Sequence, residues 1–437
     1  MNQFGLLATR RFLPLFVTQF LGALNDNIFR FALVIFITFT LSERMGIDSK
    51  LLIPLSGGVF ILPFFLFSSL AGQIADKYEK GLIIRRLKLI EIIVMGVGAL
   101  GFWLGNTVLL FCVLFCMGAQ STFFGPLKYG ILPQHLSDQE LTGGNGLIQM
   151  GTYSAIIIGV VLGGFLAALK GFGPLPVVGT VLTVAILGYI AASKIPTAPA
   201  SDPRVRINPN ILVATYRIVA YVTQHRDLLV LVLCISWFWF LGATFLSMVP
   251  TYGKEYLNAD EHVVTLLNAA FTIGIAIGSI ACERMSRGRI ELGLVPIGCV
   301  GISIFSLDFY FTSAGTNGET IITAAKFFQH FASVRAFIDL LAIGTFGAIF
   351  IIPLYAAIQA RADSSRCSRV MAALNITNAL FMVASALGTI ALYKIGLSIP
   401  EIFALLGILN ILAMLLATGY LPEFAHRLRA ILTRTRR

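Results

Sequence analysis

Long apolar runs, separated by short charged or Pro/Gly-containing segments, dominate the chain. A helix needs roughly 20 apolar residues to cross the hydrocarbon of a bilayer, and these runs have about that length. We therefore predict six membrane helices in each half of the chain. The expected spans are 12–41, 50–75, 82–104, 107–131, 142–169 and 174–194 in the first half, and 227–252, 262–282, 290–313, 335–359, 369–394 and 398–420 in the second.

A polar segment separates the two groups of spans. It begins with a Pro-rich stretch and continues from Ile211 with apolar positions that suit an interfacial helix. A second short amphipathic segment is expected at 318–334. We predict an all-α membrane protein with an N-terminal six-helix bundle (1–195), a linker with an amphipathic helix (196–226), a C-terminal six-helix bundle (227–422) and a basic tail (423–437).

The composition agrees with a membrane location. Hydrophobic residues make up 57% of the 437 residues and charged residues only 12%, whereas ordinary globular domains are about a quarter charged. The six cysteines and five histidines show none of the spacings of metal sites or disulfide frameworks. We therefore expect no metal, no cofactor and no enzymatic activity.

The net charge of +11 is best understood as a signal of membrane topology. With both termini in the cytoplasm, about 23 of the 32 basic residues fall in cytoplasmic segments and about seven outside. We therefore predict cytoplasmic termini and no nucleic-acid partner. Plain anchoring is the favoured role of the basic tail, and binding of anionic lipid is the alternative.

The two halves contain matching short sequences. Gly72-Gln-Ile-Ala-Asp76 follows the second span and Gly278-Ser-Ile-Ala-Cys282 ends the eighth, while Pro126-Leu127 and Pro353-Leu354 lie in the fourth and tenth spans. Such echoes in the same order indicate parallel repeats, which are typical of transporters.

The first span carries four polar side chains near its middle: Asn25, Asp26, Asn27 and Arg30. A central Asp or Arg costs about 2.5–3.5 kcal/mol on membrane-insertion scales, so these side chains should face a wet cavity or a partner. Asp26 and Arg30 are four residues apart and could form an intrahelical ion pair. We favour a polar face along a central path; a buried hydrogen-bonded knot between helices is the alternative. The expected face contains Thr18, Gly22, Asn25, Asp26 and Phe29.

Other polar residues in the spans are further candidates. Lys128, followed by Tyr129, could bind an anionic headgroup or snorkel to the membrane interface. Lys88 and Glu91 have the spacing of a helix pair, for which a structural role is favoured. Asp308 is an intramembrane acid without an evident partner.

Amides and aromatic residues complete the candidate set. The amides could bind a substrate or a neighbouring helix, and the tryptophans could line an apolar compartment or face lipid. The Gly159-to-Gly164 and Gly274-to-Gly278 patterns are expected to allow close helix packing. The amide and tryptophan candidates are Asn145, Gln149, Asn375, Asn378, Trp237 and Trp239.

The loop after the second span resembles the signature between helices 2 and 3 of the major facilitator superfamily. The resemblance implies a gate, in which Asp76 meets the N-terminus of the eleventh span near Ser368 and latches the two halves. The implied gating residues are Gly72, Asp76, Lys80, Arg85 and Arg86.

Three longer stretches, Phe12–Asn27, Phe124–Pro133 and Asn145–Thr152, resemble bacterial lysophospholipid transporters. The similarity is greatest to the transporter half of proteins fused to a phospholipid-remodelling acyltransferase. It implies a monomer in the bacterial inner membrane that brings lysophosphatidylethanolamine and lysophosphatidylglycerol to the inner leaflet for reacylation. This chain has no HxxxxD acyltransferase motif, so acylation would need a separate partner. The resemblance also places Asp26 in the essential polar set.

We therefore hypothesise a lysophospholipid transporter of the major facilitator fold that works by alternating access. The first, fourth, seventh and tenth spans would line its cavity, and Asn25, Asp26, Arg30, Lys128 and Asn145 would bind the headgroup. A proton-coupled carrier of small solutes or drugs and a non-transporting scaffold for an acyltransferase are the alternatives.

Overall fold

The computed structural model describes residues 3–37, 49–169, 174–258, 261–312 and 327–434, which form helices and connecting loops without any strand in these ranges. The first bundle begins with the short 3₁₀ helix η1 (Gln3–Ala8). Its long helices are α1 (Leu13–Phe36), α3 (Ser49–Lys77), α4 (Lys80–Leu104), α5 (Thr107–His135), α6 (Asp138–Ala168) and α7 (Leu175–Ser193).

The second bundle follows the linker helix α8 (Ile211–Gln224), and a 3₁₀ turn, η3 (Phe327–Gln329), precedes one of its helices. Its long helices are α9 (Arg226–Glu255), α10 (Glu261–Ser286), α11 (Leu294–Thr312), α12 (Phe331–Arg361), α13 (Cys367–Lys394) and α14 (Ile399–Tyr420). The tail forms a helix that the sequence did not predict, α15 (Glu423–Arg434).

Eleven of the described helices are long and apolar enough to cross a membrane. Helix α1 is not among these eleven, because Asn25, Asp26, Asn27 and Arg30 lower its hydropathy. Its 24 residues nevertheless extend over about 36 Å, and it packs along α6 and α7. Helix α1 completes the twelve membrane helices, and the predicted fold class is confirmed.

Glycines allow the closest helix contacts in both bundles. A Cβ atom on Gly163 of α6 would lie 2.7 Å from the Ile28 carbonyl oxygen of α1, and one on Gly278 of α10 would collide with the Thr345 carbonyl oxygen of α12. Only glycine therefore fits at these crossings, which agrees with the packing role predicted for both patterns.

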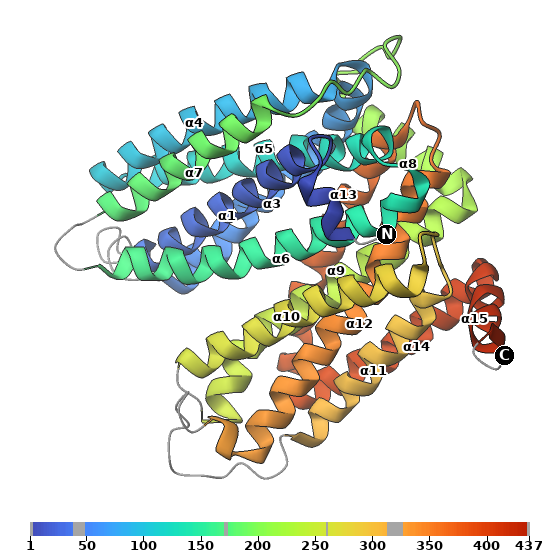
Figure 1. The fold of residues 1–437 in the computed structure, drawn as a ribbon. Coiled ribbons are helices and arrows are strands. Elements are labelled where there is room, and N and C mark those ends of the chain that lie inside the picture. Colours follow the sequence, from blue (N-terminus) through green and yellow to red (C-terminus); the bar gives the residue numbers. More distant parts are fainter. Residues whose placement is uncertain (1–2, 38–48, 170–173, 259–260, 313–326, 435–437) are drawn as a thin grey trace.

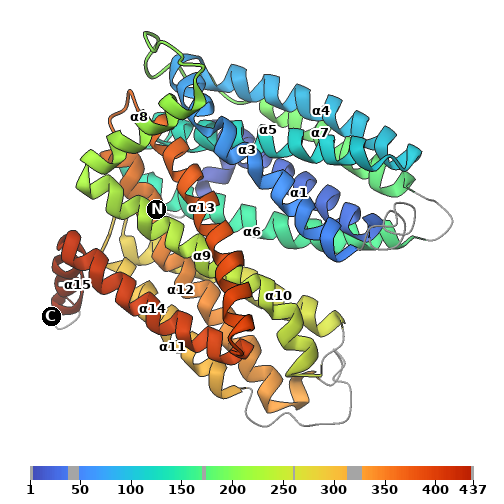
Figure 2. The same cartoon turned by 180° about the vertical axis from the view of Figure 1, so that it is seen from behind.

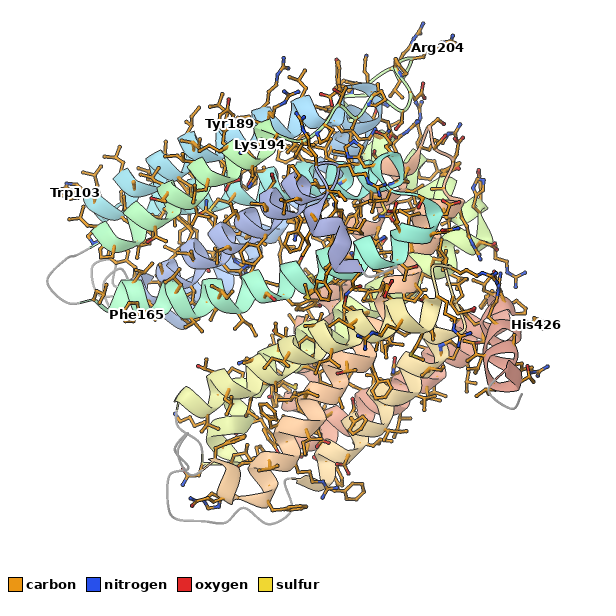
Figure 3. All side chains as sticks on the ribbon, in the orientation of Figure 1. Trp103, Phe165, Tyr189, Lys194, Arg204 and His426 are labelled. Atoms are coloured by element: carbon orange, nitrogen blue, oxygen red, sulfur yellow. The ribbon has the colours of Figure 1, made fainter. Side chains whose placement is uncertain are left out.

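The two bundles meet at the end of the molecule that carries both chain termini and diverge toward the opposite end (Figures 1 and 2). We call these the termini end and the far end. Figure 3 shows Arg204 of the linker and His426 of α15 at the termini end, whereas Trp103 and Phe165 lie near the far end.

The linker contains the amphipathic helix that the sequence predicted. Helix α8 buries Ala214, Ile218 and Val222 against the bundles, and it exposes Leu212 and Tyr216 on its other face. Of the other amphipathic segment, expected at 318–334, residues 318–326 lie outside the described residues, whereas 327–329 form η3 and 331–334 begin α12. The domain boundaries remain a prediction.

Candidate functional site

A cavity of about 290 Å³ lies between the two bundles. Helices α1, α3, α4, α5 and α6 supply most of its wall, and α9, α12 and α13 supply the rest. Its polar lining residues are Gln19, Asp26, Asn27, Arg30, Lys88, Gln120, Ser121, Lys128, Tyr129, Gln149, Thr152, Tyr355, Asn375 and Asn378, and its larger apolar ones are Phe60, Ile61, Phe64, Phe124, Ile156, Trp239 and Met382.

The charges of this cavity are distributed unequally between the halves. All four charged lining residues, Asp26, Arg30, Lys88 and Lys128, belong to the first bundle. The second bundle contributes only uncharged side chains to the described wall. A ligand between the halves would therefore meet an ionic surface on one side and an amide and aromatic surface on the other.

Asp26 and Arg30 contact different partners. The Ser121 hydroxyl donates a 2.6 Å hydrogen bond to the Asp26 carboxylate, and the Arg30 guanidinium lies 4.4 Å from the centre of the Phe60 ring. These two described side chains form no ion pair within 4 Å, so the intrahelical pair that their spacing allows is not formed. The Asp26 carboxylate and the Arg30 guanidinium both line the cavity, where a ligand could bind them.

Lys128 faces the cavity instead of snorkelling to the membrane interface. Its ammonium lies 4.8 Å from the centre of the Tyr129 ring, a cation–π distance. No carboxylate of the described residues forms an ion pair with it. Lys128 is therefore a cation that a ligand anion could neutralise.

Two tyrosines form the floor of the cavity toward the termini end. The rings of Tyr129 and Tyr355 stack with centroids 4.6 Å apart. Gln149 donates a 3.3 Å hydrogen bond to the Tyr129 hydroxyl, and the Trp239 indole donates one of the same length to the Tyr355 hydroxyl. The predicted candidates Tyr129, Gln149 and Trp239 thus lie together, at a contact between the halves.

Asn145 lies beyond this floor and does not line the cavity. Its amide donates a 2.6 Å hydrogen bond to Gln359 of the second bundle, and Gln359 donates back at 3.3 Å. Gln359 also donates to the Tyr129 carbonyl oxygen. The structure therefore places Asn145 in the closure at the termini end and not at the expected headgroup position.

The predicted latch is present at the same end. The Asp76 carboxylate accepts hydrogen bonds from the Ser368 amide at 3.1 Å and from Arg369 Nε at 2.9 Å. A Cβ atom on Gly72 would lie 2.7 Å from Ala372 Cβ, so this glycine allows α3 to approach α13. The predicted contact of Asp76 with the start of α13 is confirmed.

The remaining predicted gating residues form no hydrogen bond or ion pair with the second bundle in the described part of the chain, although Lys80 interacts electrostatically with Cys367 of α13. Lys80 donates a 2.7 Å hydrogen bond to Ser201 of the linker, Arg85 binds the Gly81 carbonyl oxygen, and Arg86 is exposed. The hydrogen bonds of Lys80 and Arg85 thus go to the linker and to their own helix. Their part in gating stays a prediction.

Asp202 of the linker joins the contact of Asp76 with α13, and nothing in the sequence predicted this. Its amide donates a 2.9 Å hydrogen bond to the Asp76 carbonyl oxygen, and its carboxylate lies 3.3 Å from an Arg369 nitrogen. Arg369 thus binds both Asp76 and Asp202. The Pro-rich sequence around Asp202 predicted only a linker.

Asn25 and Trp237 also lie away from the cavity. Asn25 is fully buried and donates a 3.0 Å hydrogen bond to Glu91, so it faces the interior of the first bundle. Trp237 donates to Asn410 of α14 and stacks on Phe240. The cavity face of α1 is offset from the predicted one and consists of Gln19, Gly22, Ala23, Asp26, Asn27 and Arg30.

Lys88 and Glu91 form the predicted helix pair, with a 2.6 Å contact. Glu91 also accepts hydrogen bonds from Asn25 and, at 2.6 Å, from Gln120. The pair is almost completely buried, yet Lys88 belongs to the cavity wall.

Asn375 and Asn378 of α13 both line the cavity. Asn378 accepts a 2.8 Å hydrogen bond from Ser236. The side-chain nitrogen of Asn375, by contrast, is buried and has no hydrogen-bond partner among the described residues. Asn375 therefore offers a donor to a ligand from the second bundle.

Asp308, for which the sequence offered no partner, binds Arg335 of α12 through both guanidinium nitrogens that face it. The two residues lie near the far ends of their helices, within the second bundle. They are separate from the residues that line the cavity.

A sequence profile of the major facilitator superfamily matches residues 15–386. The chain belongs to this superfamily. Among curated relatives, the lysophospholipid transporter LplT of Serratia proteamaculans is 29% identical over 368 residues, which cover 82% of each chain. LplT of Cronobacter sakazakii is 27% identical over 379 residues and 83% of each chain. The resemblance found in the sequence is thus confirmed.

Solved structures of the superfamily share the fold. The human organic anion transporter MFSD10 aligns with a TM-score of 0.72 at 15% identity, over 92% of this chain and 99% of that one. The fucose:proton symporter FucP of E. coli aligns with a TM-score of 0.65 at 14% identity, over 93% and 98%. At these identities the likeness concerns the superfamily fold alone.

Proposed function

We propose that this chain transports lysophospholipids across the bacterial inner membrane and has no enzymatic activity. The observation that carries the proposal is the cavity between the bundles, with three cations and one carboxylate on one wall and aromatic and amide groups on the other. A zwitterionic or anionic headgroup with an attached apolar chain complements both surfaces. The names of the curated relatives, both lysophospholipid transporters, support the same substrate class.

The size of the cavity favours a headgroup over a whole lipid. Its volume of about 290 Å³ lies just below the range of about 300–1,000 Å³ of small-molecule pockets. The single acyl chain would extend beyond it, along apolar side chains and into the bilayer. All of the residues that line the cavity come from a single chain, and we propose a monomeric transporter.

The distribution of basic residues supports cytoplasmic termini. The latch of Asp76 and the tyrosine floor would then close the cavity toward the cytoplasm. Substrate would enter from the outer side and leave toward the inner leaflet after the two bundles rock about the cavity. Lysophosphatidylethanolamine and lysophosphatidylglycerol would there become available to a separate acyltransferase.

We propose Asp26 as the central headgroup residue because it lines the cavity and has Ser121 as its only hydrogen-bonding side chain in the described structure. The chain would be reconstituted in liposomes, and translocation of a fluorescent lysophosphatidylethanolamine would be compared for the wild type and Asp26→Ala. We expect the variant to lose at least nine-tenths of the rate, on the order of the loss of a charged hydrogen bond.

Asp308→Ala is the matched control, because Asp308 is also an intramembrane acid but pairs with Arg335 away from the cavity. This variant should keep the wild-type rate. Equal rates for the wild type and Asp26→Ala would remove Asp26 from the mechanism. A wild type that moves no lysolipid but accelerates an added acyltransferase would instead indicate a scaffold.

A further inference from the structure

Lys88 of α4 reaches the cavity through a gap in α1. Its side chain is only 1% exposed, and its ammonium lies directly behind Gly22. A Cβ atom on Gly22 would lie 2.6 Å from the Lys88 ammonium nitrogen. Any larger residue at position 22 would therefore separate this cation from the cavity.

The ammonium has hydrogen-bonding capacity to spare. A lysine ammonium carries three N–H donors, and in the described structure Lys88 uses one of them, toward Glu91 at 2.6 Å. The Phe124 ring, 5.7 Å away, is a weaker neighbour. A buried cation with unused donors beside a cavity is an expected binding group for an anion.

Glu91 pairs with Lys88 but does not neutralise the positive charge of its ammonium completely. Its carboxylate accepts hydrogen bonds from three side chains, Lys88, Asn25 and Gln120, at 2.6–3.0 Å. The two amides stabilise the carboxylate charge, so the carboxylate interacts less strongly with the Lys88 ammonium. They also fix the position of Glu91 and, through it, that of Lys88.

We infer that Lys88 binds the phosphate of the substrate through the gap at Gly22. This assignment rests on the proposed lysolipid transport, which it deepens by naming the group that recognises the phosphate. Asp26 lies one helical turn from Gly22 on the same face of α1, about 6 Å along the axis. With the phosphate bound at Lys88, the Asp26 carboxylate remains available to bind the ammonium of a phosphoethanolamine headgroup.

The double variant Lys88→Gln/Glu91→Gln separates this role from simple pairing. It removes both buried charges but keeps polar side chains, so a purely structural pair would tolerate it. Affinities for lysophosphatidylethanolamine and for a monoacylglycerol of the same chain length, which has no phosphate, would be measured in detergent through tryptophan fluorescence. The wild type should bind the lysolipid more tightly than the monoacylglycerol. The affinity of the double variant for the lysolipid should be roughly tenfold to a hundredfold lower, while its affinity for the monoacylglycerol should stay unchanged.

Two further variants test the geometry. Gly22→Ala keeps both charges but covers the ammonium, and it should lower affinity for the lysolipid and not for the monoacylglycerol. Lys88→Arg keeps the cation and should retain more affinity than Lys88→Gln. Equal affinity of the wild type and the double variant for the lysolipid would overturn the assignment, as would a wild type without preference for phosphate.

Translocation in liposomes distinguishes this assignment from the proposed function. A wild type that binds the lysolipid through its phosphate but does not move it would refute transport and leave the role of Lys88 intact. A double variant that moves and binds the lysolipid like the wild type would refute the role of Lys88 and leave transport intact.

Discussion

The rings of Tyr129 and Tyr355 stack nearly parallel, with an interplanar angle of 12°, and each ring comes from a different bundle. Directly beyond them, Gln359 binds both Asn145 and the Tyr129 backbone. The cavity is thus closed toward the termini end by contacts that belong to neither half alone. Any motion that opens this end must separate the two rings.

Replacing one ring should therefore favour opening of the termini end. An aromatic pair contributes about 0.5–1.5 kcal/mol beyond its buried area, so Tyr355→Leu should raise the ratio of open to closed molecules about twofold to tenfold. Spin labels at the exposed positions Gln139 and Arg284, one on each half, would report a larger population of long distances. Tyr189→Leu, on the outer face of α7 in Figure 3, should leave the distribution unchanged.

The latch can be tested with a natural reporter, Cys367, which is buried beside Asp76. Asp76→Asn removes the carboxylate charge that accepts hydrogen bonds from the Ser368 amide and the Arg369 guanidinium. The closed state should therefore lose about 1.5–3 kcal/mol of stabilisation relative to the open state. In a variant without the other five cysteines, maleimide should react with Cys367 faster after this substitution.

The exposed Asp363 provides the control for the latch. Its carboxylate accepts a hydrogen bond from the Ser365 amide in its own turn and, among the described residues, forms no hydrogen bond or ion pair with the first bundle, so Asp363→Asn removes a charge at the same end without breaking a contact between the halves. An unchanged labelling rate in Asp76→Asn would show that the latch does not hold the halves together. Asp202→Asn should have an intermediate effect, because Asp202 is partly exposed and shares Arg369 with Asp76.

The membrane helices could be predicted from the sequence because their length and hydropathy are local properties. The structural helices α4, α7 and α14 begin and end within two residues of the predicted spans. The direction of each side chain was harder to predict. Asn25 and Asp26 are neighbours, yet one faces Glu91 in the bundle and the other faces the cavity, because packing of α1 on α6 fixes the rotation of the helix.

Partners that are distant in sequence could not be predicted at all. Asp202 meets Arg369, and Lys88 meets the cavity only because residue 22 of another helix has no side chain. Hydropathy and spacing within one helix contain no information about such contacts. The likeness to known transporters predicted the latch of Asp76 correctly because that contact is part of a sequence signature.

The close approach of α10 and α12 should depend on Gly278. A Cβ atom there would collide with the Thr345 backbone, and crowding of this kind typically costs about 1–3 kcal/mol. Gly278→Ala should therefore lower the midpoint of thermal unfolding in detergent. Gly179→Ala on α7, where nothing lies within 4 Å of the added atom, should keep or slightly raise it, since alanine favours helix. Equal midpoints would indicate that the helices adjust without cost.

Asn25, which the sequence placed among the headgroup residues, and Asn375, whose role it left open, should behave in opposite ways. Asn25→Ala removes a donor from the buried Glu91 carboxylate, which should lower the free energy of unfolding by about 1–3 kcal/mol. Asn375→Ala removes an amide whose nitrogen has no partner in the described structure, so thermal stability should be retained. Its loss should instead weaken binding of lysophosphatidylethanolamine, because the cavity loses its free donor from the second bundle. Destabilisation by Asn375→Ala, with lysolipid affinity unchanged, would assign Asn375 to helix packing.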